Sequence, residues 1–355
     1  MIVKSLLLRN FRNHTYLTYD FSLGLNVITG ANAVGKTNVV EAIHYLSLGQ
    51  SFRTNEISDL IQKGSEQAKI DVVIQEGEIE RKITAVLLKS GHVFTINGKP
   101  VKKLSELSKY VNVIIFEPKD VLMFRGLPKD RRNFLNVSIG KKSPNYIQYL
   151  STYEKLLKER NEILKTSNVD EKLLEINTEM LVKTSHAIVK YRKAYTEDIN
   201  DILNKITRAL TGTCEKFELH YYPYVECNSE FVNNAKNAFK KALENDLAKK
   251  VTSIGCHRED FSMSLNGRDI GEFGSQGENR IAALALKLAP YFLIEDKEKR
   301  PIVVLDDVMS ELDENHKERL ITFLKRFEQV FITGTKLEIP GSNHYQIKKK
   351  TKEVF

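Results

Sequence analysis

Residues 30–37 constrain this chain more than any other segment, because they read Gly-Ala-Asn-Ala-Val-Gly-Lys-Thr. The octapeptide fits the pattern G-x-x-x-x-G-K-[ST], in which backbone amides surround a phosphate chain. Residues 25–29 before it form a short run typical of a strand, and residues 38–48 after it have the apolar spacing of a helix. A strand, a glycine-flanked loop and a helix are the context that this pattern requires. The sequence therefore predicts a nucleotide-binding α/β domain.

Phosphate chemistry predicts a role for each part of this loop. Lys36 would reach the β- and γ-phosphates of a nucleoside triphosphate, and the Thr37 hydroxyl would bind Mg²⁺. The backbone amides at the positive end of the helix would bind the β-phosphate. The predicted ligands are therefore ATP and Mg²⁺. The other predicted cofactor-binding residues are the rest of the loop and the residue after it: Gly30, Ala31, Asn32, Ala33, Val34, Gly35 and Asn38.

A second predicted element is an apolar run, residues 301–305, that ends in Asp306 and Asp307. A buried strand of this kind beside a phosphate loop is a Walker B element, whose terminal carboxylate lies near Mg²⁺. Asp306 is the predicted metal residue. Asp307 would point to the other face of the strand end, where it could orient or deprotonate the attacking water. The alternative is that both acids cap the following helix.

A third element, residues 273–280, places a serine and two glycines at the start of a predicted helix. Such a helix start is a second anion site, although one ATP needs only one phosphate loop. The order of the three elements indicates that two copies of the chain sandwich each ATP. Ser275 and Gly277 of one copy would contact the γ-phosphate held by the other, with Asp313 in a loop facing the partner. The alternative is an ordinary helix N-cap.

The remaining pattern predicts an α/β head interrupted by a helical arm. Residues 69–97 alternate in polarity as in an antiparallel meander, and the closing part of the chain again alternates helices and strands. Residues 121–211 are rich in Lys and Glu, and their apolar residues keep helical spacing over stretches too short for a long coiled coil. We therefore expect residues 1–120 and 212–355 to form the head, with two or three helices of 121–211 inserted as an arm.

Composition limits the classes of protein to which this chain can belong. Lys and Arg number 54 and Asp and Glu 46, and the net charge of +8 permits a nucleic acid partner without requiring one. Three scattered cysteines argue against a disulfide framework and a zinc site. The sequence has neither a signal-peptide pattern nor the roughly 18 apolar residues of a membrane helix, so we expect a cytoplasmic protein without a membrane partner. Basic residues of the arm are candidate DNA contacts, the alternative being a solvated helical face: Lys129, Arg131, Arg132, Lys141 and Lys142.

Over essentially its whole length the chain resembles the ABC-type ATPase heads of the SMC-like branch, and within that branch the RecF family of bacterial DNA-repair proteins. The resemblance is carried by residues 6–13 (LLLRNFRN), 116–120 (FEPKD), 126–128 (GLP), 131–135 (RRNFL) and 255–260 (GCHRED), and by residues 273–280, which stand where the ABC signature lies. It implies an ABC/SMC-type P-loop ATPase head with an antiparallel β subdomain and an inserted arm. It also implies that Arg12 and Asn13 lie near the nucleotide.

The same resemblance implies a function in recombinational repair, replication and the SOS response. The protein would dimerise on ATP, clamp DNA and hydrolyse ATP slowly, with DNA stimulating the reaction. It would load a recombinase at gaps or junctions between single- and double-stranded DNA, with the RecO and RecR mediator proteins as partners.

Three other functions are alternatives to this one. An ATPase subunit of a membrane transporter is disfavoured, because residues 331–335 (FITGT) lack the histidine of transporter heads and an arm separates the motifs. In a non-hydrolysing structural DNA clamp, ATP would only hold the dimer together. A nuclease is disfavoured, because no carboxylate cluster remains once the ATPase acids are assigned.

Overall fold

The computed structural model describes residues 1–348, which fold as two compact units. The first unit comprises Met1–Asp120, Arg208–Thr213 and the chain from Lys287 onward. The second comprises Val121–Thr207 and Cys214–Leu286. Residues 349–355, the end of the second predicted head segment, lie outside the described residues.

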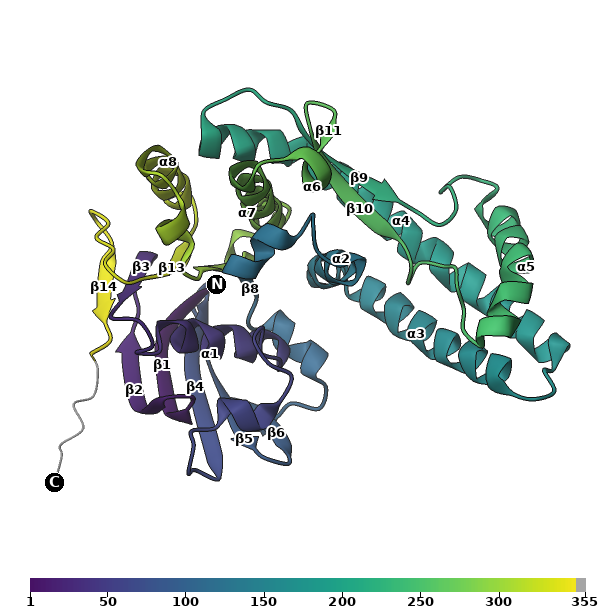
Figure 1. Ribbon diagram of the computed structural model, residues 1–355. Helices are drawn as coiled ribbons and strands as arrows, with labels where there is room; N and C mark the ends of the chain where they lie inside the picture. Colours follow the sequence, from purple (N-terminus) through teal and green to yellow (C-terminus); the bar gives the residue numbers. More distant parts are fainter. Residues whose placement is uncertain (349–355) are drawn as a thin grey trace. The chain divides into compact units, whose positions relative to one another are not determined.

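The first unit contains a parallel sheet whose strands have the order β14-β3-β13-β12-β8 (Figure 1). Every residue of β8, β12 and β13 is buried, as a parallel sheet covered on both faces requires. Strand β13 lies between the strand that leads into residues 30–37 and the strand that ends at Leu305, so the two predicted motifs are not on neighbouring strands. The strands of this sheet are β3 (Gly24–Thr29), β8 (Val113–Phe116), β12 (Ile302–Leu305), β13 (Gln329–Gly334) and β14 (Asn343–Gln346).

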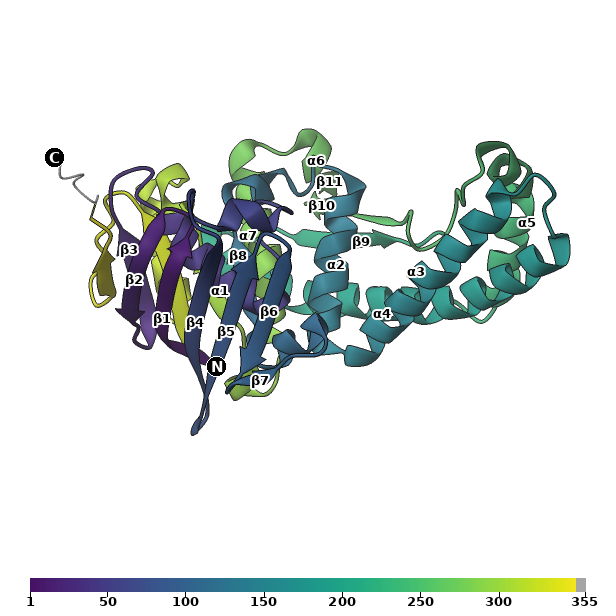
Figure 2. The same ribbon diagram turned by 90° about the horizontal axis from the view of Figure 1, so that it is seen from below.

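The first unit also contains an antiparallel sheet with the strand order β2-β1-β4-β5-β6-β7 (Figure 2). The meander predicted for residues 69–97 corresponds to β4, β5 and β6. Asn97 and Gly98 both have positive φ angles, 48° and 79°, which suits the tight turn between β6 and β7. The strands are β1 (Ile2–Phe11), β2 (His14–Asp20), β4 (Gln67–Glu76), β5 (Ile79–Leu88), β6 (Gly91–Ile96) and β7 (Lys99–Pro100).

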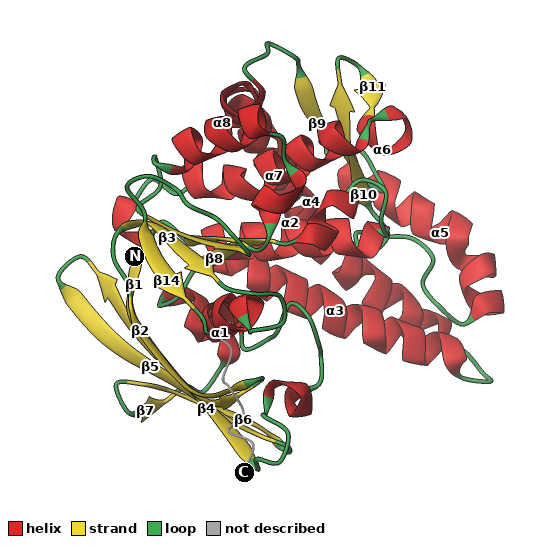
Figure 3. Ribbon diagram, turned by 60° about the vertical axis from the view of Figure 1, so that its left-hand side comes forward, coloured by secondary structure: helices red, strands yellow, loops and turns green. Residues whose placement is uncertain are grey.

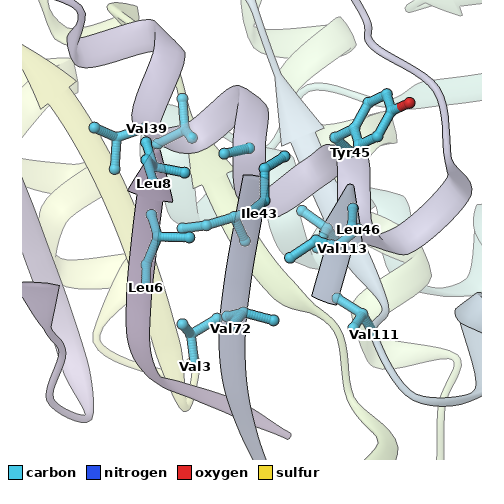
Figure 4. Packing of buried hydrophobic residues seen from close by; sticks show 14 of the residues in the cluster. Val3, Leu6, Leu8, Val39, Ile43, Tyr45, Leu46, Val72, Val111 and Val113 are labelled. Atoms are coloured by element: carbon cyan, nitrogen blue, oxygen red, sulfur yellow. The ribbon is translucent and has the colours of Figure 1, made fainter. Parts of the chain in front are cut away.

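Helix α1 (Lys36–Leu48) contacts strands of both sheets, and residues 39–47 of it are buried. Figure 4 shows Ile43 and Val39 among side chains of β1 and β4. Because α1 begins at the end of residues 30–37, its burial fixes that loop relative to both sheets. The other helices of this part of the chain are η1 (Ile57–Leu60), η2 (Leu104–Lys109), η3 (Pro118–Leu122), η4 (Lys297–Lys299), η5 (Val308–Glu311) and α8 (Glu314–Leu324).

Helices dominate the second unit, and a small antiparallel sheet with the order β11-β10-β9 accompanies them (Figure 3). Prolines open α2 and α3, a position that needs no amide hydrogen bond. The elements are α2 (Pro128–Lys142), α3 (Pro144–Lys165), α4 (Glu171–Thr211), β9 (Phe217–Tyr222), α5 (Phe231–Lys249), β10 (Asp260–Leu265), β11 (Arg268–Asp269), α6 (Ile270–Phe273) and α7 (Gln276–Phe292). The C-terminal ends of α4 and α7 belong to the first unit.

Residues 214–286 belong to the helical unit, whereas the sequence analysis placed them in the second part of the head. The reason is that β9 is attached to α4 by side chains. Asn200 bonds both the amide and the carbonyl of Leu219, at 2.8 and 2.9 Å, and Asn204 accepts from the amide of Phe217 at 2.9 Å. The sequence of a strand attached in this way alternates like that of a strand in the head. The pattern therefore could not assign β9 to the helical unit.

A buried ion pair joins α4 to residues 255–260 of the second unit. The Arg192 guanidinium donates to the Glu259 carboxylate at 2.6 Å and to the carbonyl of Cys256 at 2.6 Å. Glu259 also accepts from the Tyr221 hydroxyl and from the amide of Tyr224. Every charge in this cluster is therefore matched by a partner, which a buried ion pair requires for stability.

His257 lies beside this cluster as a neutral imidazole. Its Nε2 is 3.2 Å from the carbonyl of Thr252, which can only accept, so Nε2 carries the hydrogen. Nδ1 then accepts from the Tyr153 hydroxyl at 2.8 Å. Burial lowers the pKa of His257 to about 4 and outweighs the hydrogen bond to the Thr252 carbonyl, which raises it, while the nearby charges of Arg258 and Arg132 lower it further.

Replacing Glu259 by Gln should destabilise the protein by about 3 kcal/mol, because it leaves the Arg192 charge buried without its counter-ion. Urea denaturation followed by circular dichroism measures the effect. The control is Asp198→Asn, which removes the exposed ion pair with Lys142 and should cost less than about 1 kcal/mol. Equal effects of the two substitutions would contradict the structural role of the Arg192–Glu259 pair.

The lowered pKa of His257 predicts a pH dependence of stability. Between pH 6.5, its ordinary pKa, and pH 4 the unfolded chain binds a proton at this position and the folded chain does not. Stability should therefore fall as the pH drops through this window. His257→Gln should flatten that slope in thermal melts, whereas His344→Gln, which removes an exposed imidazole, should leave it intact.

Candidate nucleotide site

The loop between β3 and α1 has the backbone conformation expected of a phosphate-binding loop. Gly30, Ala33 and Gly35 have positive φ angles of 155°, 65° and 104°. A Cβ on Gly35 would lie 2.4 Å from both the Asn13 Oδ1 and the His14 Nε2 atoms, so only glycine fits there. The amides that follow Gly35 open α1, where the helix dipole favours an anion.

The Lys36 side chain lies across this loop. Its ammonium donates to the carbonyls of Gly30 and Ala31, at 2.9 and 3.0 Å. The positive charge is thus held at the loop rather than extended into solvent. A phosphate group at the loop would meet that charge and the amides of the α1 start together.

Hydroxyl groups from two other segments converge on Asp306 at the end of β12. Thr37 donates to the Asp306 Oδ1 atom at 3.0 Å, and Thr333, at the end of β13, donates to the same atom at 2.6 Å. The amide of Asp307 donates to the Thr333 hydroxyl at 2.9 Å. Asp306 is buried, whereas Asp307 is exposed and has a left-handed backbone with φ 52°. The two acids therefore occupy different environments, as different roles require.

The charge of Asp306 is held in a protein interior. Burial raises the pKa of Asp306, the hydrogen bonds from Thr333 and Thr37 lower it, the charge of Asp307 raises it and that of Arg53 lowers it. Mg²⁺ prefers oxygen ligands and keeps few of them from the protein. The Thr37 hydroxyl and the Asp306 carboxylate, 3.0 Å apart, are a donor set that fits this ion.

Arg12 and Asn13 both lie at this site, but in different ways. The Asn13 amide donates to the carbonyl of Val34 at 2.8 Å and its oxygen accepts from Asn38, so it supports the loop from outside. Arg12 donates to both oxygens of Glu41, at 2.9 and 2.6 Å. The positive charge of Arg12 is therefore paired with a buried carboxylate of α1, and this contact stabilises the position of that helix.

Several residues of the site carry no signal in a single sequence. Arg53 donates to the Asn38 side chain at 2.8 Å and lies 3.5 Å from Glu41, which adds a cation beside the start of α1. Ser51 donates to Glu41 at 2.5 Å. Thr333 could have been found, because a hydroxyl at the end of a parallel strand next to β12 must lie near Asp306. Arg53 and Ser51 could not, because a short irregular segment carries no periodicity.

The segment 273–280 belongs to the second unit, whereas the phosphate loop belongs to the first. Ser275 is the N-cap of α7 in a capping box. Its hydroxyl accepts from the amide of Glu278 at 3.2 Å, and the Glu278 carboxylate accepts from the amide of Ser275 at 2.6 Å. The Ser275 hydroxyl keeps its own hydrogen to donate, and both Ser275 and Gly277 are exposed. The cap and an anion site are therefore compatible.

Asp313 is the N-cap of α8. Its carboxylate accepts from the amide of His316 at 3.0 Å and lies 2.5 Å from the His316 ring. These contacts hold the pKa of Asp313 below its ordinary value. These contacts join Asp313 to the first turn of α8.

The candidate DNA contacts of the arm differ widely in exposure. Arg131 is buried and donates to both oxygens of Asp260 at 2.7 Å, so the expectation that it contacts DNA is corrected: it holds α2 to β10. Arg132 donates to the carbonyl of Glu259 at 2.8 Å. Lys142 pairs with Asp198, Lys141 is half-buried and Lys129 is exposed.

Comparisons with known proteins agree with this architecture. The model of the RecF/RecN/SMC N-terminal domain matches residues 2–352. The DNA replication and repair protein RecF of Clostridium novyi (strain NT) is 36% identical, over 95% of this chain and 94% of its own length. That of Bacillus pumilus (strain SAFR-032) is 34% identical, over 100% and 98%. The chain belongs to the RecF family.

Solved structures of RecF proteins are also similar to this chain. The recombination mediator protein RecF–ATPrS of the RecFOR pathway has a TM-score of 0.88 and 34% identity, covering 98% of this chain and 96% of that one. The RecF–ATP structure has a TM-score of 0.86, with 35% identity and coverage of 94% and 93%. An Smc head domain from Pyrococcus furiosus, at 0.57 and 18%, shows the shared fold. The predicted family and ATPase-head fold are confirmed. Among residues 1–348, no helix has the length and apolar character to cross a bilayer.

Replacing Lys36 by Met should weaken ATP binding by at least about tenfold, because charge-assisted hydrogen bonds to phosphate are lost. Titration with a fluorescent ATP analogue measures the affinity. The control is Lys99→Met, which removes an exposed cation of the first unit and should leave the affinity unchanged. Wild-type affinity in the Lys36 variant would refute the assignment of the phosphate loop.

Proposed function

We propose that this chain is a Mg²⁺-dependent ATPase that dimerises on ATP around DNA and opens again after hydrolysis. The observation that carries the proposal is a pair of helix starts of different kinds, each suited to an anion. One is the phosphate loop with Lys36, Thr37 and Asp306, and the other is the exposed start of α7 with Ser275 and Gly277. A single ATP on one copy uses only the first of these.

The phosphate loop would bind the triphosphate. Lys36 and the amides at the start of α1 would take the β- and γ-phosphates, while Asn13 holds the loop at the carbonyl of Val34. Thr37 and Asp306 would hold Mg²⁺, which neutralises charge on the phosphate oxygens. The burial of Asp306 makes its charge costly without such a cation.

Asp307 would orient or deprotonate the attacking water. Its left-handed backbone costs on the order of 1 kcal/mol in a residue with a Cβ. Two hydrogen bonds hold it there, one from its own amide to Thr333 and one from the Ser310 hydroxyl to its carbonyl, at 2.9 and 2.8 Å. A backbone held in this way fixes the point from which the exposed Asp307 side chain projects next to Asp306, and a candidate general base must be positioned in this way.

The second copy would complete the site. Its Ser275 hydroxyl and the amides around Gly277 would contact the γ-phosphate, and its Asp313 loop would face the partner. ATP would then stabilise the closed dimer, and DNA held in that dimer would stabilise the same state. The two ligands should therefore enhance each other's binding, and DNA should stimulate hydrolysis.

The relatives supply the biological setting. They are DNA replication and repair proteins, and the solved structures are of a recombination mediator in the RecFOR pathway. We therefore assign to this chain the loading of a recombinase at single-strand gaps or duplex junctions in the cytoplasm, together with RecO and RecR proteins. Lys129 and Lys142, both exposed, are the arm cations that remain for contact with DNA phosphates.

Replacing Asp307 by Asn should lower the rate of single-turnover ATP hydrolysis by at least about a hundredfold, because the water loses its base. Sedimentation velocity with Mg²⁺ should then show a monomer without nucleotide or with ADP, and a dimer with ATP that DNA strengthens. The control is Asp20→Asn, an exposed acid of β2, which should hydrolyse ATP at the wild-type rate.

Two outcomes would contradict the proposal in different places. A monomer under every condition would leave the nucleotide site in place but refute the ATP-dependent dimer. A stable dimer whose hydrolysis is unaffected by the Asp307 substitution would remove Asp307 from the reaction.

A further inference from the structure

His14 is a buried imidazole that contacts the phosphate loop. It is the first residue of β2 and is 7% exposed. Its Nε2 atom lies 3.1 Å from the carbonyl oxygen of Gly35. Because a carbonyl oxygen can only accept, Nε2 carries the hydrogen and donates it. A buried histidine therefore donates a hydrogen bond to the peptide group that joins Gly35 to Lys36.

The direction of this peptide group matters for phosphate binding. A phosphate loop needs its amides turned toward the anion, and in a trans peptide the carbonyl then points the opposite way. The carbonyl of Val34 accepts from Asn13 at 2.8 Å, and the next carbonyl, that of Gly35, accepts from His14. Two neighbouring side chains thus hold two successive carbonyls away from the phosphate side. The amides of Gly35 and Lys36 belong to these peptide groups and are turned by the same contacts.

Gly35 is the residue of the loop that most needs such support. Its φ angle of 104° is one that a glycine reaches easily, but a glycine also has many other conformations open to it. A Cβ at this position would collide with the side chains of both Asn13 and His14. The two side chains therefore pack directly on the glycine and restrict it. The Gly35 carbonyl also accepts from the amides of Asn38 and Val39, at 3.1 and 3.3 Å, so His14 acts where α1 begins.

The donor itself is held by elements outside the loop. His14 pairs with Phe11 of β1 across a two-residue turn. In that turn the Arg12 amide donates to the carbonyl of Leu60 at 2.8 Å, and the Arg12 guanidinium is paired with Glu41 of α1. A side chain supported by two strands and a helix can hold a glycine in one conformation, which a side chain on a free loop could not do.

We propose that His14 is a positioning residue for nucleotide binding. Its Nε2–H group keeps the Gly35 carbonyl turned away from the phosphate, so that the amides at the start of α1 face the β-phosphate. This inference rests on the nucleotide site of the proposed function. The imidazole acts through the backbone and not by contact with the nucleotide, because its Nε2 hydrogen is directed at the Gly35 carbonyl. ATP and ADP share the β-phosphate, so His14 should contribute equally to the binding of both.

Three substitutions of His14 separate the hydrogen bond from the space that the ring fills. In His14→Gln the side-chain nitrogen is as many bonds from Cβ as Nε2 is, so the donor is kept. His14→Asn is too short to reach, and His14→Leu fills the space without a donor. Titration with fluorescent ATP and ADP analogues should give affinities within about twofold of wild type for the Gln variant. The Asn and Leu variants should bind both nucleotides at least about fivefold more weakly, the effect of one lost hydrogen bond.

The matched control is His344→Leu, which replaces an exposed histidine of β14 and should change neither affinity. Circular dichroism and thermal melts without nucleotide establish that each variant is folded at the titration temperature. If the shorter Asn side chain prevents folding, the comparison of the Gln and Leu variants still decides between a donor and a filler of space.

The outcomes separate this inference from the nucleotide site on which it rests. A Leu variant that binds both nucleotides as tightly as wild type refutes the inference, and so does a Gln variant as weak as the Leu variant. Loss of ATP affinity with ADP affinity unchanged also refutes it, because the effect would then lie at the γ-phosphate. Wild-type affinity in Lys36→Met would refute the nucleotide site itself, whereas weak binding by Lys36→Met with full binding by His14→Leu refutes the inference alone.

Discussion

The hydrogen bonds of Asp306 are the interaction on which the first unit depends. A single carboxylate oxygen accepts from Thr37 at the start of α1 and from Thr333 at the end of β13, while Asp306 itself ends β12. Three segments that are far apart in the sequence are thereby fixed at one edge of the parallel sheet. The carboxyl ends of parallel strands meet at this edge, which is why a phosphate loop, a candidate metal ligand and a candidate base can all lie there. This arrangement buries the charge of the Asp306 carboxylate, which costs free energy, and a bound cation would offset that cost.

A part of the site could be predicted from the sequence only where its residues lie close together along the chain. The phosphate loop and the run ending in Asp306 and Asp307 are each contiguous in the sequence, so both could be predicted from a local pattern. The contacts of Arg53 and Ser51 join segments that no local pattern connects. The second unit shows the same limit, because Asn200 and Asn204 attach β9 to α4 by side chains that a hydrophobic pattern does not contain.

The arm shows why a count of charges is a poor guide to nucleic acid contacts. Arg131 and Arg132 stand with Lys129 in a basic stretch, yet Arg131 is buried against Asp260, which lies 129 residues further along the chain. An arginine that satisfies a distant carboxylate cannot also serve a phosphate. Only exposure, which the sequence does not contain, separates such a structural cation from one free to bind DNA.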